Sequence, residues 1–259
     1  MTTASIINLK GGIGKTMTAC NMAAILAGEH KKSVLVIDAD PQHNATDFFG
    51  VDAKDCGGTT ASILAGFGGE WTDFVSETSW AGLDIVPSDI SLIKCDIAAV
   101  SAQLNGSGLL RGFLEAVKED GAYDYCLIDC PSGFTAASVS AIVASDVVII
   151  PAKVDAFALS GIAELAAQIE ALRRVQPRVR IGGALVTMWH NADVVAQGEE
   201  LLRRSGIPVY ETVIRRTDKV DESTFAGVAV HRYSRRCSAG RDYLRFVKEF
   251  LEKEEKDNG

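Results

Sequence analysis

The alternation of short apolar runs with helix-length segments restricts what this chain can fold into. Runs rich in Val, Ile and Leu, as in strands buried on both faces, occupy residues 4–9, 34–37, 83–86, 125–128, 147–150 and 181–186. Helical periodicity covers residues 15–28, 89–103, 109–118, 135–145, 159–175 and 193–205. This order predicts the α/β class, with a mostly parallel twisted sheet and helices on both of its faces.

The size and composition of the chain fit one domain. Of its 259 residues, 47% are hydrophobic, which is enough for a substantial core, and we expect a single domain over residues 1–259. The Gly-, Ser- and Thr-rich segment 57–69 is typical of a surface excursion. No apolar run approaches the ~20 residues of a membrane-spanning helix, and residues 1–10 do not resemble a signal peptide, so we expect a cytoplasmic protein. The six scattered cysteines lack zinc-ligand spacing, and we expect reduced, mostly buried thiols.

A glycine-rich turn between the first expected strand and the first expected helix carries the strongest functional signal. Residues 10–16 read Lys-Gly-Gly-Ile-Gly-Lys-Thr. Glycines let the backbone curl so that its N–H groups point at phosphate oxygens, and the following helix N-terminus adds partial positive charge. Lys15 would then reach the β- and γ-phosphates of a nucleotide, and the Thr16 hydroxyl would ligate Mg²⁺. The ordinary Walker A motif is not met, because Leu9 stands where that motif has its first glycine.

This turn resembles the deviant Walker A motif of the ParA/MinD superfamily, Lys-Gly-Gly-x-Gly-Lys-Thr. The resemblance implies ATP as the nucleotide, and it implies that Lys10 is a signature lysine that reaches the partner's nucleotide across an ATP-dependent homodimer. The implied nucleotide contacts in the loop are Lys10, Gly11, Gly12, Ile13, Gly14, Lys15, Thr16 and Met17. Met17 stands where members commonly carry a hydroxyl residue, but its backbone N–H can still serve a phosphate.

Carboxylates follow two of the other expected strands. Asp38 and Asp40 end the run that starts at residue 34, and their alternate spacing points them the same way. The segment resembles the superfamily's switch I motif, Asp-x-Asp-Pro-Gln-x-Asn. By that resemblance Asp40 positions the attacking water and Asp38 supports the metal shell. Asp129 ends the run 125–128 and matches a Walker B aspartate that holds Mg²⁺.

These positions together define the expected ATPase site. The catalytic residues implied are Lys10, Lys15 and Asp40, and the metal residues implied are Thr16, Asp38 and Asp129. Cys130-Pro131-Ser132 resembles switch II, although the family often has a second proline where Ser132 stands. We expect slow hydrolysis of ATP to ADP and phosphate that a partner protein accelerates.

The resemblance extends over nearly the whole chain. In the family, a Pro-Arg-Asn element contacts the adenine. Here the corresponding residues are Arg215, Arg216 and Thr217, so that only the central arginine is kept. The resemblance therefore implies nucleotide contacts from Arg216 and Thr217.

A basic segment lies in an otherwise acidic chain. The net charge is −8, yet residues 215–248 contain nine Lys/Arg and four Asp/Glu. Such asymmetry can mark a nucleic-acid surface or simply a solvated face. Members of the family bind DNA nonspecifically on this side, and Lys219 stands at one such position, whereas Ala192 replaces an arginine at another. The DNA-binding candidates are Arg215, Lys219, Arg232, Arg235, Arg236 and Arg241, with Arg245 beside them.

Several functions fit the motif. Segregation of plasmid or chromosomal DNA with a ParB-like adaptor is the commonest role implied, and positioning of a protein cargo is the alternative. A MinD-like membrane regulator would need a basic amphipathic C-terminal helix, whereas residues 249–259 hold five acids and two lysines, so we expect no membrane binding. An iron–sulfur reductase would need paired cluster cysteines, for which only Cys95 and Cys130 are candidates. A scaffold that binds ATP without hydrolysis is the third alternative, although no expected catalytic residue is missing.

Overall fold

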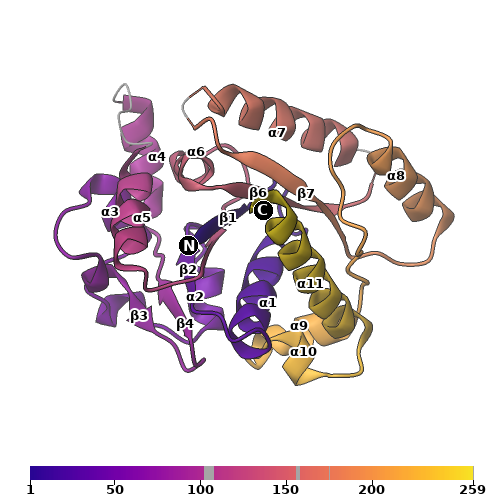
Figure 1. The fold of residues 1–259 in the computed structure, drawn as a ribbon, viewed down its shortest axis with the longest axis horizontal. Coiled ribbons are helices and arrows are strands. Elements are labelled where there is room, and N and C mark those ends of the chain that lie inside the picture. The colour runs from indigo at the N-terminus through magenta and orange to yellow at the C-terminus, as the bar shows by residue number, and fades with distance from the viewer. Residues whose placement is uncertain (102–107, 156–157, 175, 259) are drawn as a thin grey trace.

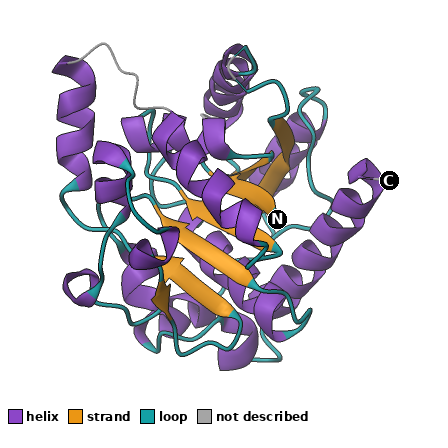
Figure 2. Ribbon diagram, turned by 60° about the vertical axis from the view of Figure 1, so that its left-hand side comes forward, coloured by secondary structure: helices purple, strands orange, loops and turns teal. Residues whose placement is uncertain are grey.

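One seven-stranded sheet runs through the protein (Figures 1 and 2). The structure is a computed structural model, and it describes residues 1–101, 108–155, 158–174 and 176–258. The strands are β1 (Thr2–Ile6), β2 (Val34–Asp38), β3 (Ser76–Glu77), β4 (Leu83–Val86), β5 (Tyr125–Asp129), β6 (Val147–Lys153) and β7 (Arg180–Thr187). They lie in the order β3-β4-β2-β5-β1-β6-β7, and every pair is parallel except the edge pair β3–β4. The predicted α/β class with a mostly parallel sheet is confirmed.

Helices cover both faces of this sheet, as Figure 2 shows. They are α1 (Lys15–Gly28), α2 (Asn44–Phe48), α3 (Thr60–Gly66), α4 (Leu92–Ser101), α5 (Leu109–Asp120), α6 (Ala136–Ala144), α7 (Ala158–Leu172), α8 (Asp193–Arg203), α9 (Asp218–Phe225), α10 (Val230–Tyr233) and α11 (Ser238–Asn258). Short 3₁₀ turns occupy Ala53–Asp55 and Trp71–Phe74. Within the described residues, no helix combines the length and the apolar character needed to cross a membrane.

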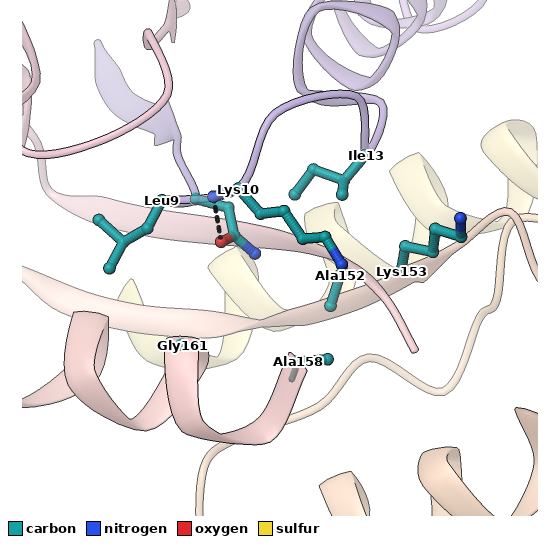
Figure 3. A pocket seen from close by; sticks show the side chains of 8 residues that line it. Leu9, Lys10, Ile13, Ala152, Lys153, Ala158 and Gly161 are labelled. Carbon is teal, nitrogen blue, oxygen red and sulfur yellow. Dashed lines mark hydrogen bonds between the residues drawn. The ribbon is translucent and has the colours of Figure 1, made fainter. Parts of the chain in front are cut away.

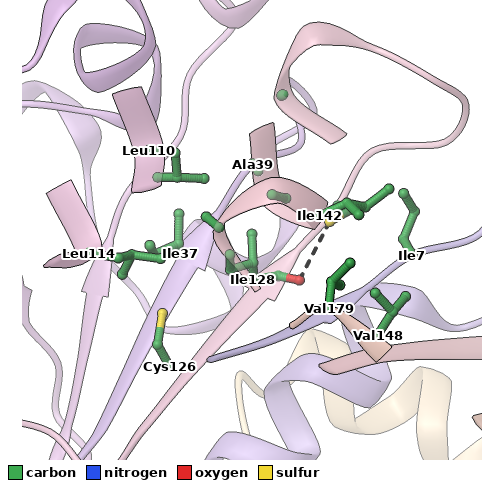
Figure 4. Packing of buried hydrophobic residues seen from close by; sticks show 14 of the residues in the cluster. Ile7, Ile37, Ala39, Leu110, Leu114, Cys126, Ile128, Ile142, Val148 and Val179 are labelled. Carbon is green, nitrogen blue, oxygen red and sulfur yellow. Dashed lines mark hydrogen bonds between the residues drawn. The ribbon is translucent and has the colours of Figure 1, made fainter. Parts of the chain in front are cut away.

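The sheet separates two apolar cores, because its strands are buried on both faces. On one face, α3, α5, α6 and α7 pack on side chains such as Ile37, Ile128 and Val148, and Figure 4 shows Leu110 and Leu114 of α5 in this core. On the other face, α1 and α11 cover alternate side chains of the same strands. Burial on both faces explains why the strands read as continuous apolar runs.

The structure differs from the sequence expectations at several boundaries. The first strand ends at Ile6, three residues before its expected end, because the chain leaves the sheet toward the glycine-rich turn. The expected ends of two helices, at residues 103 and 175, lie outside the described residues. Segment 57–69 contains α3, whose Ile63 is fully buried.

The largest omission in the sequence analysis is the final helix. Helix α11 buries an apolar stripe whose helical spacing is readable in the sequence: Ala239, Tyr243, Phe246, Val247 and Phe250. Helix α11 lies beside α1 (Figure 1), and its stripe packs into the core that the two helices share. The helix is therefore part of the fold, and its apolar side is already covered.

Candidate nucleotide site

The glycine-rich turn lies at the carboxyl end of β1, in the centre of the sheet. Two of its glycines, Gly12 at φ +67° and Gly14 at φ +88°, adopt the left-handed backbone conformation that other residues rarely adopt. Gly14 is also the N-cap of α1. The start of the turn is fixed by Asn8, whose side chain donates to the Pro151 carbonyl at 2.7 Å and accepts from the backbone N–H of Lys10 at 3.1 Å. The backbone has the curled form expected of a phosphate loop.

Lys15 is buried beneath this turn. Its ammonium donates to the carbonyl of Lys10 at 3.0 Å and to the hydroxyl of Ser132 at 2.7 Å. Burial lowers the pKa of Lys15, and the nearby carboxylates of Asp129 and Asp40 oppose that shift. The oxygens of a bound ligand could take the place of the Lys10 carbonyl and the Ser132 hydroxyl as acceptors of the Lys15 ammonium.

Three carboxylates gather beside Lys15, as the strand order requires. β5 lies between β1 and β2, and Asp38 pairs in register with Asp129 at the carboxyl ends of their strands. Asp38 is buried, and its two oxygens accept from the backbone N–H of Asp40 at 3.1 Å and from both the N–H and the hydroxyl of Thr46 at 2.8 and 2.7 Å. Burial raises the pKa of Asp38 to about 6, against the effect of these hydrogen bonds.

Asp129 differs from Asp38 because, among the described residues, only the nearby Thr16 hydroxyl approaches its carboxylate as a hydrogen-bond donor. Both of its oxygens are buried, and neither has a hydrogen-bond partner of normal geometry among the described residues. Burial, followed by the charge of Asp38, raises the pKa of Asp129, and the nearby hydroxyl of Thr16 opposes this. A buried carboxylate needs a compensating partner. A divalent cation held by Asp129 and Thr16 would supply one, so these residues fit Mg²⁺, whereas the oxygens of Asp38 are already engaged.

A cavity of about 270 Å³ lies between the start of α1 and the end of β7, away from the three carboxylates. It brings together four residues expected to contact nucleotide, namely Gly14, Met17, Arg216 and Thr217. The Thr217 side chain caps α9 by accepting from the N–H of Lys219. The cavity is also lined by residues that the sequence did not predict to contact nucleotide: Lys153, Thr187, Met188, His190, Ile214, Asp218, Val220, Asp221 and Tyr243. The size and position of the cavity suit the nucleoside part of a nucleotide.

The C-terminal helix holds one wall of this cavity in place. Asp242 of α11 is almost fully buried, and it accepts two side-chain hydrogen bonds from Arg215, at 2.8 and 2.7 Å, and one from the backbone N–H of Arg215 at 3.1 Å. Glu249 accepts from the backbone N–H groups of Glu211 and Thr212 at 2.7 and 2.9 Å. Arg215, one of the DNA-binding candidates, thus pairs with a buried carboxylate and lines the cavity, and its contact with DNA stays a prediction.

Lys10 lies at the outer edge of the turn, half-exposed. Figure 3 shows its side chain extending toward Ala152 across a small cavity of about 50 Å³. Its ammonium forms an ion pair with Asp155 of the same chain. In this conformation Lys10 is bound within its own subunit.

The remaining basic candidates lie apart from the phosphate turn, on or beside α9, α10 and α11. The side chain of Arg232 stacks over Trp80, with 4.6 Å between guanidinium carbon and ring centroid, and Lys219 pairs with Glu222. The exposed candidates without an ion pair among the described residues are Arg235, Arg236 and Arg241, which lie between α10 and the first turn of α11. Arg245 is exposed, and its guanidinium Nη1 lies 3.8 Å from Oδ1 of Asp242.

The fold and the site define a P-loop nucleoside-triphosphatase class. A glycine-rich turn joins the interior strand β1 to a helix, and a buried aspartate with no hydrogen-bond partner of normal geometry among the described residues ends the neighbouring strand β5. The profile of a family described as "AAA domain" matches residues 1–181. The chromosome partitioning protein ParA of Caulobacter vibrioides is 34% identical over 253 residues, covering 96% of this chain and 94% of the relative. The chain belongs to this family. It also belongs to the ParA/MinD superfamily, which the residues of the turn indicated.

Other comparisons agree. The sporulation initiation inhibitor protein Soj of Bacillus subtilis is 33% identical over 254 residues, covering 95% of this chain and 96% of the relative. McdA of Cyanothece in its apo form superposes with a TM-score of 0.85 at 24% identity, covering 97% and 99% of the two chains. A cobyrinic acid a,c-diamide synthase from Mycobacterium smegmatis, solved with an ATP analogue and magnesium, gives 0.82 at 24% identity, covering 97% and 94%. The two structures establish a shared fold.

Proposed function

We propose that the protein is an ATP-dependent switch that dimerises on ATP, binds DNA nonspecifically and hydrolyses ATP in order to segregate plasmid or chromosomal DNA in the cytoplasm. The observation that carries the ATPase part is the buried, unpartnered carboxylate of Asp129 beside Lys15 at the phosphate turn. The partition role is supported by the similarity to ParA and Soj over most of the chain.

The residues of the site have separate tasks in this mechanism. The backbone N–H groups of the turn and the Lys15 ammonium bind the phosphates, and the ammonium neutralises charge as it develops in phosphoryl transfer. Magnesium, bound by Thr16 and Asp129, would neutralise further charge on the β- and γ-phosphates. Asp40 accepts a hydrogen bond from the attacking water. Asp38 holds the switch I segment that follows β2 in place through its hydrogen bonds to Thr46 and to the backbone N–H of Asp40.

Dimerisation depends on Lys10 in this proposal. Its ion pair with Asp155 must break before the ammonium can reach a second subunit. We expect Lys10→Ala to bind nucleotide with the affinity of the wild type and to lose the ATP-dependent dimer, measured by size-exclusion chromatography with light scattering. Lys248→Ala, at an exposed surface lysine, is the matched control and should dimerise normally. An unchanged dimer in Lys10→Ala would refute this role.

The DNA-binding part is tested with protein that cannot complete hydrolysis. We expect Asp40→Ala to bind arbitrary duplex with ATP·Mg²⁺ and much more weakly with ADP·Mg²⁺. Binding through about four phosphate contacts should weaken by about a hundredfold between about 50 and 200 mM salt. Fluorescence anisotropy of labelled duplex measures both effects. Absence of duplex binding in both nucleotide states would mean that the ATP switch acts on a surface other than DNA.

A pair of charge reversals locates the DNA surface. Arg235→Glu with Arg236→Glu should weaken duplex binding at least tenfold without changing ATP turnover, because each reversal removes a phosphate contact and adds repulsion. Arg173→Glu with Arg174→Glu makes the same charge change beyond the end of α7 and should leave binding unchanged. Equal loss in both double variants would indicate a general charge effect.

Positioning of a protein cargo by the same ATP-dependent switch is the alternative function. Both functions require an adaptor, of ParB type in the partition case. A MinD-like membrane role is the weaker alternative, because the apolar stripe of α11 is buried in the core.

A further inference from the structure

Ser132 occupies a position that neither the sequence motif nor the proposed mechanism uses. It follows β5 by three residues and is exposed at the open face of the site. Its hydroxyl accepts from the Lys15 ammonium at 2.7 Å. It also lies against the phosphate turn, since a Cβ atom built on Gly11 would be 3.4 Å from its oxygen. Ser132 therefore contacts both parts of the phosphate-binding machinery.

The direction of a bound nucleotide follows from the order of the strands. The nucleoside cavity lies on the β6–β7 side of the turn, where Thr187 and Ile214 line it. Asp40 and Asp129 lie on the other side, at the ends of β2 and β5. A triphosphate that starts in the cavity and passes the N-terminus of α1 ends on the β5–β2 side. Its terminal phosphate is thus the one that comes nearest to Ser132.

The chemistry of the Lys15–Ser132 contact makes the hydroxyl available to that phosphate. An anionic phosphate oxygen is a stronger acceptor for an ammonium than a neutral hydroxyl is. A serine hydroxyl can also donate a hydrogen bond, and the Ser132 hydroxyl donates to no group among the described residues. When a phosphate oxygen takes the place of Ser132 on Lys15, the hydroxyl is left close to that oxygen with its proton free to donate.

We propose that Ser132 is a contact of the terminal phosphate, so that it discriminates ATP from ADP. The inference rests on the proposed ATPase function and adds a residue to it. The Ser132 hydroxyl donates to an oxygen that only the triphosphate has. A proline at this position, as the family often has, could make no such bond.

The test compares two nucleotides and two substitutions by isothermal titration calorimetry in Mg²⁺. The probes are AMPPNP, a non-hydrolysable ATP analogue, and ADP. We expect Ser132→Ala to raise the Kd for AMPPNP about tenfold, the typical effect of removing a hydrogen bond to a charged group, and to leave the Kd for ADP within about twofold. Ser132→Thr keeps a hydroxyl and should bind both nucleotides as the wild type does.

The outcomes separate this inference from the proposed function. If Ser132→Ala binds both nucleotides more tightly, Ser132 is a competitor of phosphate for Lys15, and the inference is wrong. It is equally wrong if both affinities fall together or if neither changes. If the wild type itself binds neither nucleotide, the proposed function fails, and the inference fails with it.

Discussion

Replacement of Asp40 by alanine is expected to reduce ATP hydrolysis to about 1% of the wild-type rate or less, while nucleotide binding and the ATP dimer persist. The loss is large because a side chain that accepts the proton of the attacking group contributes about 10²–10⁴ in rate. The substitution removes one hydrogen bond, from the backbone N–H of Gln42 to the Asp40 carboxylate at 2.9 Å. The backbone of Asp40 itself stays bonded, because its N–H donates to Asp38 and its carbonyl accepts from the Ser88 hydroxyl at 2.7 Å. Phosphate release and size-exclusion chromatography measure the two effects.

Asp47→Ala is the matched control, since Asp47 is exposed on α2 just beyond the same switch. It should hydrolyse ATP at the wild-type rate. Normal turnover by Asp40→Ala would show that another group orients the water. Loss of nucleotide binding in Asp40→Ala would show that the carboxylate supports the site as a whole.

Phe246→Ala is expected to destabilise the protein by about 4 kcal/mol, which corresponds to a fall in Tm of roughly 10 °C. Phe246 is 0% exposed in the core between α11 and the sheet, and its ring meets that of Tyr210 edge-on with 4.9 Å between centroids. Truncation removes this contact and leaves a cavity. Phe225→Ala makes the same substitution at a ring that is 95% exposed and should change stability by less than about 0.5 kcal/mol.

Phe246→Ala should also weaken nucleotide binding. Helix α11 carries Asp242 and Glu249, which bond the segment that forms one wall of the 270 Å³ cavity. Thermal unfolding with and without ATP·Mg²⁺ measures both quantities. A smaller stabilisation by nucleotide in Phe246→Ala than in Phe225→Ala is the expected result. An equal stabilisation would show that the wall keeps its shape without a well-packed α11.

Much of the phosphate region could be predicted from the sequence because its signals are local. The turn at residues 10–16 needs glycines at fixed spacing, and the aspartates that follow β2 and β5 mark strand ends. Parallel strands bring their carboxyl ends to one edge of the sheet, but that β2 and β5 are neighbours, so that Asp38 meets Asp129, is a finding of the structure. The sequence did not indicate that Thr46 would hydrogen-bond the Asp38 carboxylate through both its backbone N–H and its hydroxyl.

The rest of the site depends on contacts between distant segments. Nothing near Arg215 in the sequence indicates that Asp242, 27 positions further on, will accept hydrogen bonds from it. Ser132 had only the absent proline as its signal, and its bond to Lys15 joins residues 117 positions apart. Lys153 and His190 entered the cavity from strand ends whose loops carry no motif.

The central position of β1 has a consequence for synthesis of the chain. The strand that carries the phosphate turn is made before both of its neighbours, since Thr2 pairs with Tyr125 and Ala4 with Val147. At about 5–20 residues per second, β1 waits on the order of 10 s for its neighbours, and the cavity wall waits longer, for Asp242 and Glu249. A growing chain therefore displays the motif well before it can bind nucleotide tightly. Under the proposed function, ATP would stabilise only molecules in which the segments that carry Asp242 and Glu249 have docked.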